Sequence, residues 1–147
     1  MTAASPCTFC GIVAGERPAA RVLEDGSFVA FLDVRPLFPG HTLVVPRAHH
    51  ETLTDLPPSE VGPLFERVRD LAGAMEDALG AQGSFVAVNN RVSQSVPHLH
   101  VHVVPRTKGD GLRGFFWPRQ RYGSDEEMAD VADRLRSSLT GSSGEDG

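Results

Sequence analysis

The chain has 147 residues, of which 40% are hydrophobic and 22% are charged, as in a single globular domain and unlike a disordered chain. Its formal net charge of −5 argues against a general nucleic-acid-binding protein, which usually has an excess of basic residues on its surface. No segment has the roughly 18 to 20 consecutive apolar residues of a membrane span, and the N-terminus lacks the pattern of a signal peptide, so we expect a cytoplasmic protein with no membrane partner.

The N-terminal third of the chain predicts one short helix and three strands. We expect residues 1–6 to form a flexible end and Cys7–Gly15 to form the helix. The turn signal Asp25-Gly26 separates the first two strands and is typical of a β-hairpin. The three strands are expected at residues 21–24, 28–32 and 41–45.

The strongest helical pattern runs from Val61 to Leu79, where apolar residues recur with a period of about 3.6 and therefore share one face. Gly80 is a typical residue for the end of a helix. Pro63 does not fit a helix interior, because proline has no backbone N–H to donate. The regular helix therefore either begins near Gly62 or has a kinked first turn.

The rest of the chain predicts two strands, a long loop and a second main helix. We place these elements at residues 85–89, 99–105, 107–123 and 125–139, in that order. Ser124 is the expected N-cap of the helix, and acidic residues follow it in the first turn. Residues 140–147 are expected to form a disordered tail. This order of elements favours an α+β fold with a mostly antiparallel sheet, in a single domain over residues 7–139.

Three of the six histidines lie at alternate positions, His98, His100 and His102. On a strand, alternate side chains point to the same side, so the three imidazoles line one surface while the apolar residues between them face the core. A neutral imidazole can attack phosphorus when its other nitrogen donates a hydrogen bond that fixes the tautomer. Neighbouring imidazoles can donate to phosphate oxygens or protonate a leaving group. The alternative is a strand whose histidines only pack, which is costly for polar rings without partners.

The run from His98 to Val104 resembles the signature of the histidine triad (HIT) family, His-φ-His-φ-His-φ-φ with φ apolar, at every position. The resemblance extends over about Cys7–Arg136. It includes Phe31-Leu32-Asp33, Pro39-Gly40-His41-Thr42-Leu43-Val44-Val45-Pro46, Val88-Asn89 and Gln94-Ser95. The resemblance implies a five-stranded antiparallel sheet with two main helices, and a homodimer in which the long helices pack together.

The resemblance also implies roles for individual residues. His100 is the expected nucleophile that takes the nucleoside monophosphate, with His98 and His102 on either side of it and His102 near phosphate or the leaving group. Gln94 and Ser95 would contact phosphate or the bridging oxygen. Asp33 and Asn89 would serve the ribose and phosphate side of the nucleotide. We interpret His41 as structural.

The branch of the family decides the expected substrate. Three segments resemble the fragile-histidine-triad branch of dinucleoside polyphosphate hydrolases, at residues 55–61, 104–110 and 124–128. The start Cys7-Thr8-Phe9-Cys10 is instead typical of bacterial members with zinc, and histidine at the third triad position argues against galactose-1-phosphate uridylyltransferase relatives, which have glutamine there. We therefore expect a hydrolase of adenylylated substrates, dinucleoside polyphosphates above all, that works through a covalent His100-AMP intermediate. The alternatives are a Hint-like adenosine phosphoramidate hydrolase, a dinucleoside polyphosphate phosphorylase, and a nucleotide-binding regulatory module with little turnover.

Cys7 and Cys10 supply half of a tetrahedral zinc site. The family resemblance suggests that His49 and His98 complete it, and the adjacent His50 is an open alternative to His49. Two other interpretations of the cysteines are a pair of ordinary reduced thiols and a redox pair, although no thioredoxin-like βαβ context is present.

A basic stretch follows the triad. Its cations are Arg106, Lys108, Arg113, Arg119 and Arg121, and it also contains Phe115, Phe116 and Trp117. These residues would either hold a polyphosphate and stack a second base, or form a solvated loop whose aromatic side chains pack at a dimer surface.

Overall fold

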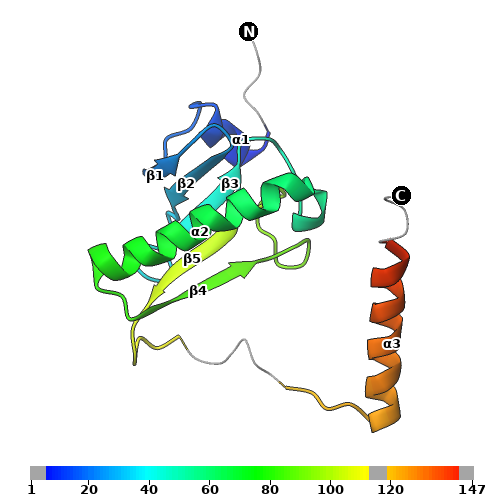
Figure 1. Ribbon diagram of the computed structural model, residues 1–147. Coiled ribbons are helices and arrows are strands. Elements are labelled where there is room, and N and C mark those ends of the chain that lie inside the picture. The colour runs from blue at the N-terminus through cyan, green and yellow to red at the C-terminus, as the bar shows by residue number, and fades with distance from the viewer. Residues whose placement is uncertain (1–5, 113–118, 143–147) are drawn as a thin grey trace. The chain divides into compact units, whose positions relative to one another are not determined.

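The computed structural model describes residues 6–112 and 119–142 (Figure 1). The chain forms two compact units, Met1–Asp110 and Gly111–Gly147, and each is described by itself. No helix among the described residues is both long enough and apolar enough to cross a membrane.

The first unit contains a five-stranded sheet in which all neighbouring strands are antiparallel. The strand order is β1-β2-β3-β5-β4. The strands are β1 (Arg21–Glu24), β2 (Phe28–Leu32), β3 (Thr42–Pro46), β4 (Gly83–Val88) and β5 (Val101–Arg106). This confirms the predicted α+β fold with a five-stranded antiparallel sheet. The predicted hairpin is also present, and Asp25 Oδ1 accepts hydrogen bonds from the backbone N–H groups of Ser27 and Phe28 at 2.7 and 2.8 Å.

The long helix α2 (Pro58–Leu79) lies across one face of the sheet (Figure 1). It begins three residues before the predicted start and passes through Pro63, so a start near Gly62 was wrong. Pro58 fits the first turn, where a backbone N–H has no helical partner to lose. Proline at position 63 removes the helical donor to the carbonyl of Ser59, and both residues are exposed. The helix ends at Gly80, which has a left-handed φ of 68°, as the sequence predicted.

Alternating side chains of the strands separate two apolar clusters, one on each face of the sheet. Phe28 and Ala30 of β2 pack on the α2 side with Leu64, Val68, Leu71 and Met75. Val29 and Phe31 point to the other face, where the short helix α1 (Thr8–Val13) contributes Phe9 and Ile12. The sheet is therefore covered by α2 on one face and by α1 on part of the other.

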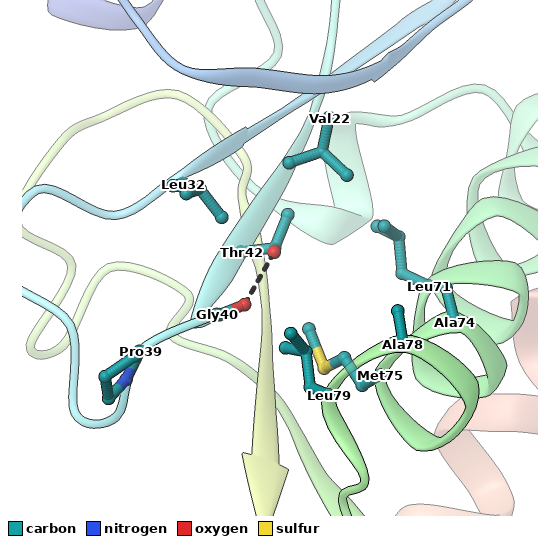
Figure 2. A pocket seen from close by; sticks show the side chains of 10 residues that line it. All are labelled: Val22, Leu32, Pro39, Gly40, Thr42, Leu71, Ala74, Met75, Ala78 and Leu79. Atoms are coloured by element: carbon teal, nitrogen blue, oxygen red, sulfur yellow. Dashed lines mark hydrogen bonds between the residues drawn. The ribbon is translucent and has the colours of Figure 1, made fainter.

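On the α2 side a cavity of about 340 Å³ remains between the first three strands and the C-terminal half of the helix (Figure 2). Its lining is almost entirely apolar and includes Val22, Leu32, Met75 and Leu79. The Thr42 hydroxyl, which also lines it, donates to the Gly40 carbonyl at 2.8 Å. This cavity contains none of the predicted site residues.

The second unit contains the helix α3 (Asp125–Ser142). Its start agrees with the prediction, and Ser124 Oγ accepts the Glu127 N–H at 3.1 Å as expected of an N-cap. The helix continues three residues beyond the predicted end, so residues 140–142 are helical and not part of a disordered tail. Residues 1–5 and 143–147, predicted as flexible ends, and 113–118 of the predicted loop lie outside the described residues.

Candidate active site and metal centre

The histidine run lies at the start of β5, on the face of the sheet that α1 covers. The strand begins at Val101, so His98 and His100 precede it, and the predicted strand start at Leu99 was wrong. The alternation of side chains nevertheless continues through the run. Leu99, Val101 and Val103 are buried in the α2-side cluster, whereas the rings of His98 and His100 contact Phe9 of α1 at centroid distances of 5.9 and 5.0 Å.

One nitrogen of His100 is fixed by the backbone. Its Nδ1 lies 2.8 Å from the carbonyl oxygen of His98, and because a carbonyl can only accept, Nδ1 carries the proton and Nε2 keeps its lone pair. Burial lowers the pKa of His100 below the usual value for histidine, although the His98 carbonyl and the Asp33 carboxylate partly offset this effect. His100 is therefore a neutral imidazole at pH 7, as a nucleophile must be.

His102 is fixed through a chain of two hydrogen bonds. The Leu37 N–H donates to Nδ1 of His41 at 3.1 Å, so the proton of His41 is on Nε2, which lies 2.9 Å from Nδ1 of His102. His102 accepts this proton at Nδ1, so the N–H of its own neutral ring is on Nε2. Burial, with additional contributions from His100 and His41, lowers the pKa of His102 to about 4, so this ring is a neutral hydrogen-bond donor at pH 7.

His41 is the residue that the sequence analysis undervalued. It is 4% exposed, and its ring joins a backbone N–H to a triad histidine instead of only packing. The one signal in the sequence was its place in the Pro39-Gly40-His41 segment of the family resemblance.

Asp33 lies beside this chain, with Oδ2 3.8 Å from Nε2 of His41. Asp33, His41 and His102 each offer a ligand atom within 4.8 Å of the others, which is close enough for a metal ion. However, the Leu37 N–H keeps the proton of neutral His41 on Nε2, the atom that would have to coordinate the ion. The close approach of Asp33, His41 and His102 is therefore better explained by hydrogen bonding than by a metal ion.

His100 and His102 line a cavity of about 430 Å³, which is within the range of small-molecule sites. Phe9, Ile12, Phe31, Val34 and Leu43 are among its apolar lining residues. Of the predicted site residues, Asp33 and Ser95 also line it, whereas Gln94 and Asn89 are not among the described lining residues. The Gln94 side chain instead bonds to the backbone of Arg91 and Glu51, and Asn89 follows β4 with an exposed side chain.

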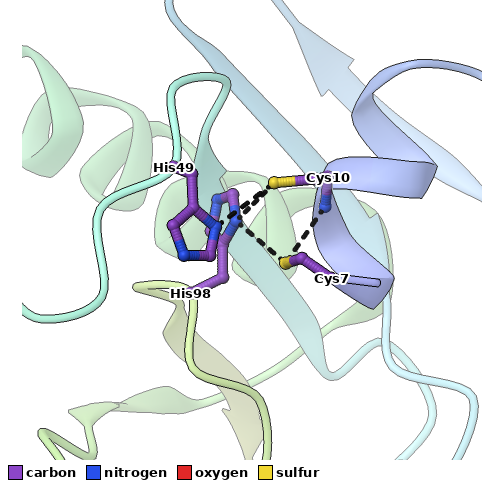
Figure 3. A group of neighbouring side chains, drawn as sticks. All are labelled: Cys7, Cys10, His49 and His98. Atoms are coloured by element: carbon purple, nitrogen blue, oxygen red, sulfur yellow. Dashed lines mark hydrogen bonds between the residues drawn. The ribbon is translucent and has the colours of Figure 1, made fainter. Parts of the chain in front are cut away.

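The four predicted metal ligands lie together (Figure 3). Cys10 Sγ is 3.2 Å from Nδ1 of His49, and both sulfurs are 3.5 Å from Nδ1 of His98. Sulfur and nitrogen ligands of one tetrahedral zinc ion stand about 3.6 Å apart, so these separations fit the ion closely. His50 points elsewhere, with Nε2 3.9 Å from a Glu60 carboxylate oxygen, and this geometry favours His49 over His50.

Two backbone features prepare these ligands. His98 Nε2 lies 2.8 Å from the Pro46 carbonyl oxygen, so Nε2 carries the proton and Nδ1 presents its lone pair to the two sulfurs. Cys7 is the N-cap of α1, and its sulfur accepts the Cys10 N–H at 3.4 Å. Two thiols and two imidazoles in this arrangement suit zinc.

Two basic residues of the stretch after the triad, Arg106 and Lys108, belong to the first unit. Arg106 forms a two-pronged ion pair with Asp110, at 2.6 and 2.9 Å, and neither Arg106 nor Lys108 lines the cavity. Arg17 is the one arginine or lysine among its described lining residues. Arg119 and Arg121 belong to the second unit, and Arg113 and the three aromatic residues lie outside the described residues.

Comparison with known proteins agrees with this geometry. The HIT domain model matches residues 14–109, about two thirds of the chain. The chain belongs to the HIT domain family. The family resemblance seen in the sequence is thereby confirmed.

The relatives of this HIT protein include enzymes. It is 42% identical over 109 residues to an uncharacterised HIT-like protein of Mycobacterium tuberculosis, covering 73% of this chain and 76% of that one. It is 35% identical over 113 residues to an adenylylsulfatase of Arabidopsis thaliana, with 76% and 57% covered. A bis(5'-nucleosyl)-tetraphosphatase (asymmetrical) of Schizosaccharomyces pombe is 41% identical over 83 residues, with 55% and 46% covered. These named hydrolases support the prediction of an enzyme.

A solved structure bears on the metal centre. A zinc-bound histidine triad family protein from Mycobacterium smegmatis is 37% identical to this chain, with a TM-score of 0.71 over 93% of this chain and 97% of that one. A HIT fold of this kind therefore accommodates zinc.

Proposed function

We propose that this HIT protein hydrolyses adenylylated substrates at the α-phosphate through a covalent His100-AMP intermediate. The observation that carries the proposal is His100 itself, a buried neutral ring whose Nδ1–H is held by the His98 carbonyl and whose Nε2 is left for the cavity. The alternative of histidines that only pack does not account for a cavity lined by two of them. A regulatory module with little turnover would need the same cavity but not a fixed tautomer.

The proposed reaction has two displacements. His100 Nε2 attacks the α-phosphorus, an N–P bond forms, and the bond to the leaving group breaks with its electron pair. Water then attacks the same phosphorus, the N–P bond breaks, AMP is released and the proton of the water passes to solvent. His102, as a neutral Nε2–H donor, stabilises the phosphate oxygens, while Asp33 faces the ribose and Ser95 the phosphate.

The identity of the leaving group is a separate part of the proposal. The preference for dinucleoside polyphosphates rested on the segments that resemble the fragile-histidine-triad branch and on the basic stretch. However, Arg106 is paired with Asp110, and Arg17 is the one lysine or arginine among the described lining residues. A second candidate, favoured by the single cation among the lining residues of the first unit, is a hydrolase of adenylylated compounds with a small leaving group, such as a phosphoramidate or an adenylyl sulfate. By its name, the Arabidopsis relative acts on a substrate with a small leaving group. By its name, the S. pombe relative acts on a dinucleotide.

The proposal includes a structural zinc ion held by Cys7, Cys10, His49 and His98, a cytoplasmic location and a homodimer. Zinc bound at Nδ1 of His98 would support the backbone carbonyl that fixes His100, without using the nucleophile as a ligand. The mass of the particle in solution, measured by light scattering, tests the dimer.

The covalent intermediate can be tested directly. Rapid acid-free quenching of a reaction with excess substrate should trap AMP on His100, and peptide mapping should locate it there. A panel of diadenosine tetraphosphate, adenosine phosphoramidate and adenylyl sulfate, each with and without inorganic phosphate, ranks the leaving groups by kcat/KM and separates hydrolase from phosphorylase. An adduct on another residue, or no adduct and no turnover with AMP still bound, would contradict the proposal.

A further inference from the structure

The segment between β4 and the triad contains an unfavourable backbone conformation. Arg91 and Ser93 have φ values of 68° and 61°, and they are the non-glycine residues with positive φ in the described part of the chain. Residues other than glycine, asparagine and aspartate rarely adopt this left-handed backbone conformation. Surrounding contacts must therefore hold this turn in place.

Gln94 follows this turn directly, and both ends of its side-chain amide are used. Oε1 accepts the Arg91 N–H at 2.8 Å, which closes the turn across the two left-handed residues. Nε2 donates to the Glu51 carbonyl at 2.6 Å, in the segment between β3 and the short 3₁₀ helix η1 (Leu53–Asp55). The amide therefore joins the turn to a second part of the backbone.

Two other hydrogen bonds join the same segments. Asn90 Oδ1 accepts the Leu53 N–H at 2.8 Å, and the Leu99 N–H donates to the His50 carbonyl at 2.7 Å. The bond from Gln94 lies between them. Gln94 directly precedes Ser95 and Val96, which line the nucleotide cavity.

We propose that Gln94 is a positioning residue, which holds residues 91–95 in their left-handed turn and so places Ser95 at the cavity beside His100. This replaces the sequence-based expectation that Gln94 contacts phosphate itself. The inference rests on the proposed function only in taking the cavity to be the nucleotide site.

Two variants test the hydrogen bonds of Gln94. Gln94→Ala removes both, while Gln94→Glu keeps an acceptor for the Arg91 N–H and replaces the donor to Glu51 with a carboxylate oxygen. Gln82→Ala is the matched control, because Gln82 Oε1 also accepts one backbone N–H, that of Lys108 at 2.8 Å, and Gln82 is not among the described cavity-lining residues. Amide hydrogen exchange of the ligand-free protein should become at least about 10-fold faster over residues 89–98 in both Gln94 variants and should not change there in Gln82→Ala.

Kinetics and ligand binding give the second readout. With a positioning role, Gln94→Ala should lower kcat by about 10-fold with a smaller change in KM, and Ser95→Ala should cost little more in the Gln94→Ala background than alone. Unchanged hydrogen exchange, together with weaker binding of AMP but not of adenosine, would overturn the proposal in favour of direct phosphate contact. If the wild-type protein binds neither AMP nor adenosine, the proposed function fails, and the hydrogen-exchange comparison still decides the role of Gln94.

Discussion

The candidate metal centre and the candidate catalytic cavity use histidines two positions apart, yet each presents a different ring nitrogen. His98 donates through Nε2 to the Pro46 carbonyl and presents Nδ1 to the cysteines. His100 donates through Nδ1 to the His98 carbonyl and keeps Nε2 for the cavity. The two rings have the same chemistry, so the position of a backbone carbonyl decides which of them suits a metal and which suits phosphorus. Substitutions at the metal centre and substitutions at the catalytic cavity should therefore have separate effects on zinc binding and on turnover.

The largest expected effect is on the catalytic side. His100→Asn should lower kcat by about 10⁴-fold or more, because no other group supplies a neutral nucleophile at that position. Turnover with the best substrate of the panel measures this loss. Zinc content and the thermal midpoint should stay close to those of the wild type, and an active variant would show that His100 is not the nucleophile.

On the metal side, the double change Cys7→Ser and Cys10→Ser should remove zinc and lower the free energy of unfolding. With free zinc at 100 to 1,000 times its Kd, the expected loss is about 3 to 4 kcal/mol. Metal analysis and urea unfolding measure the two effects. His50→Ala is the control, because the His50 ring lies near Glu60 and outside the ligand group, and a fully stable, metal-free wild-type protein would reject the site.

A smaller effect is expected from His41, which acts through His102. His41→Ala should lower kcat by about 10- to 100-fold, because Nδ1 of His102 loses the donor that fixes its tautomer. The dissociation constant for AMP and the zinc content should change little. Phe38→Ala, at a half-buried neighbour of the same loop, controls for loosening of the loop, and an equal loss of kcat in that variant would mean that His41 only packs.

The last prediction concerns acid stability. The pKa of His102 is about 4 in the folded protein, because of burial and the neighbouring His100 and His41, against 6.5 as the ordinary value, while Asp33 opposes this shift. The unfolded chain therefore binds a proton first, so the free energy of unfolding should fall as the pH falls from about 6.5 to about 4. Urea unfolding at several pH values measures the slope. His102→Asn should show a shallower slope, and equal slopes would mean that His102 does not carry the effect.

Periodicity and alternation allowed much of this molecule to be predicted. The period of the apolar residues located α2, the alternation from His98 to Val103 separated the histidines from the core, and the spacing of Cys7 and Cys10 indicated half a metal site. These patterns are local. The geometry of a helix or a strand is enough to determine which side chains share one face of the element. The predicted start of α2 was too late because the apolar period begins only at Val61, whereas the first turn, from Pro58, is polar or exposed.

Other features depend on contacts between distant segments. The partnership of His41 and His102 follows from the pairing of β3 with β5, in which Leu43 is opposite His102, and no local pattern fixes that register. The choice of His49 over His50 depends on the path of the chain after β3. The backbone partners of Gln94 depend on a turn whose residues carry no glycine signal, so no local pattern predicts them.

The hydrogen-bond chain that begins at Leu37 gives the cavity a fixed polarity. A backbone N–H cannot be turned into an acceptor, so His41 cannot exchange its donor and acceptor nitrogens, and neutral His102 can only offer a proton toward the cavity. A ligand group that arrives with lone pairs, such as a phosphate or sulfate oxygen, is complementary to this end of the cavity. A protonated amine at the same place meets another donor. A peptide bond two side chains away from the cavity would thus favour oxyanions over ammonium groups at this end of it.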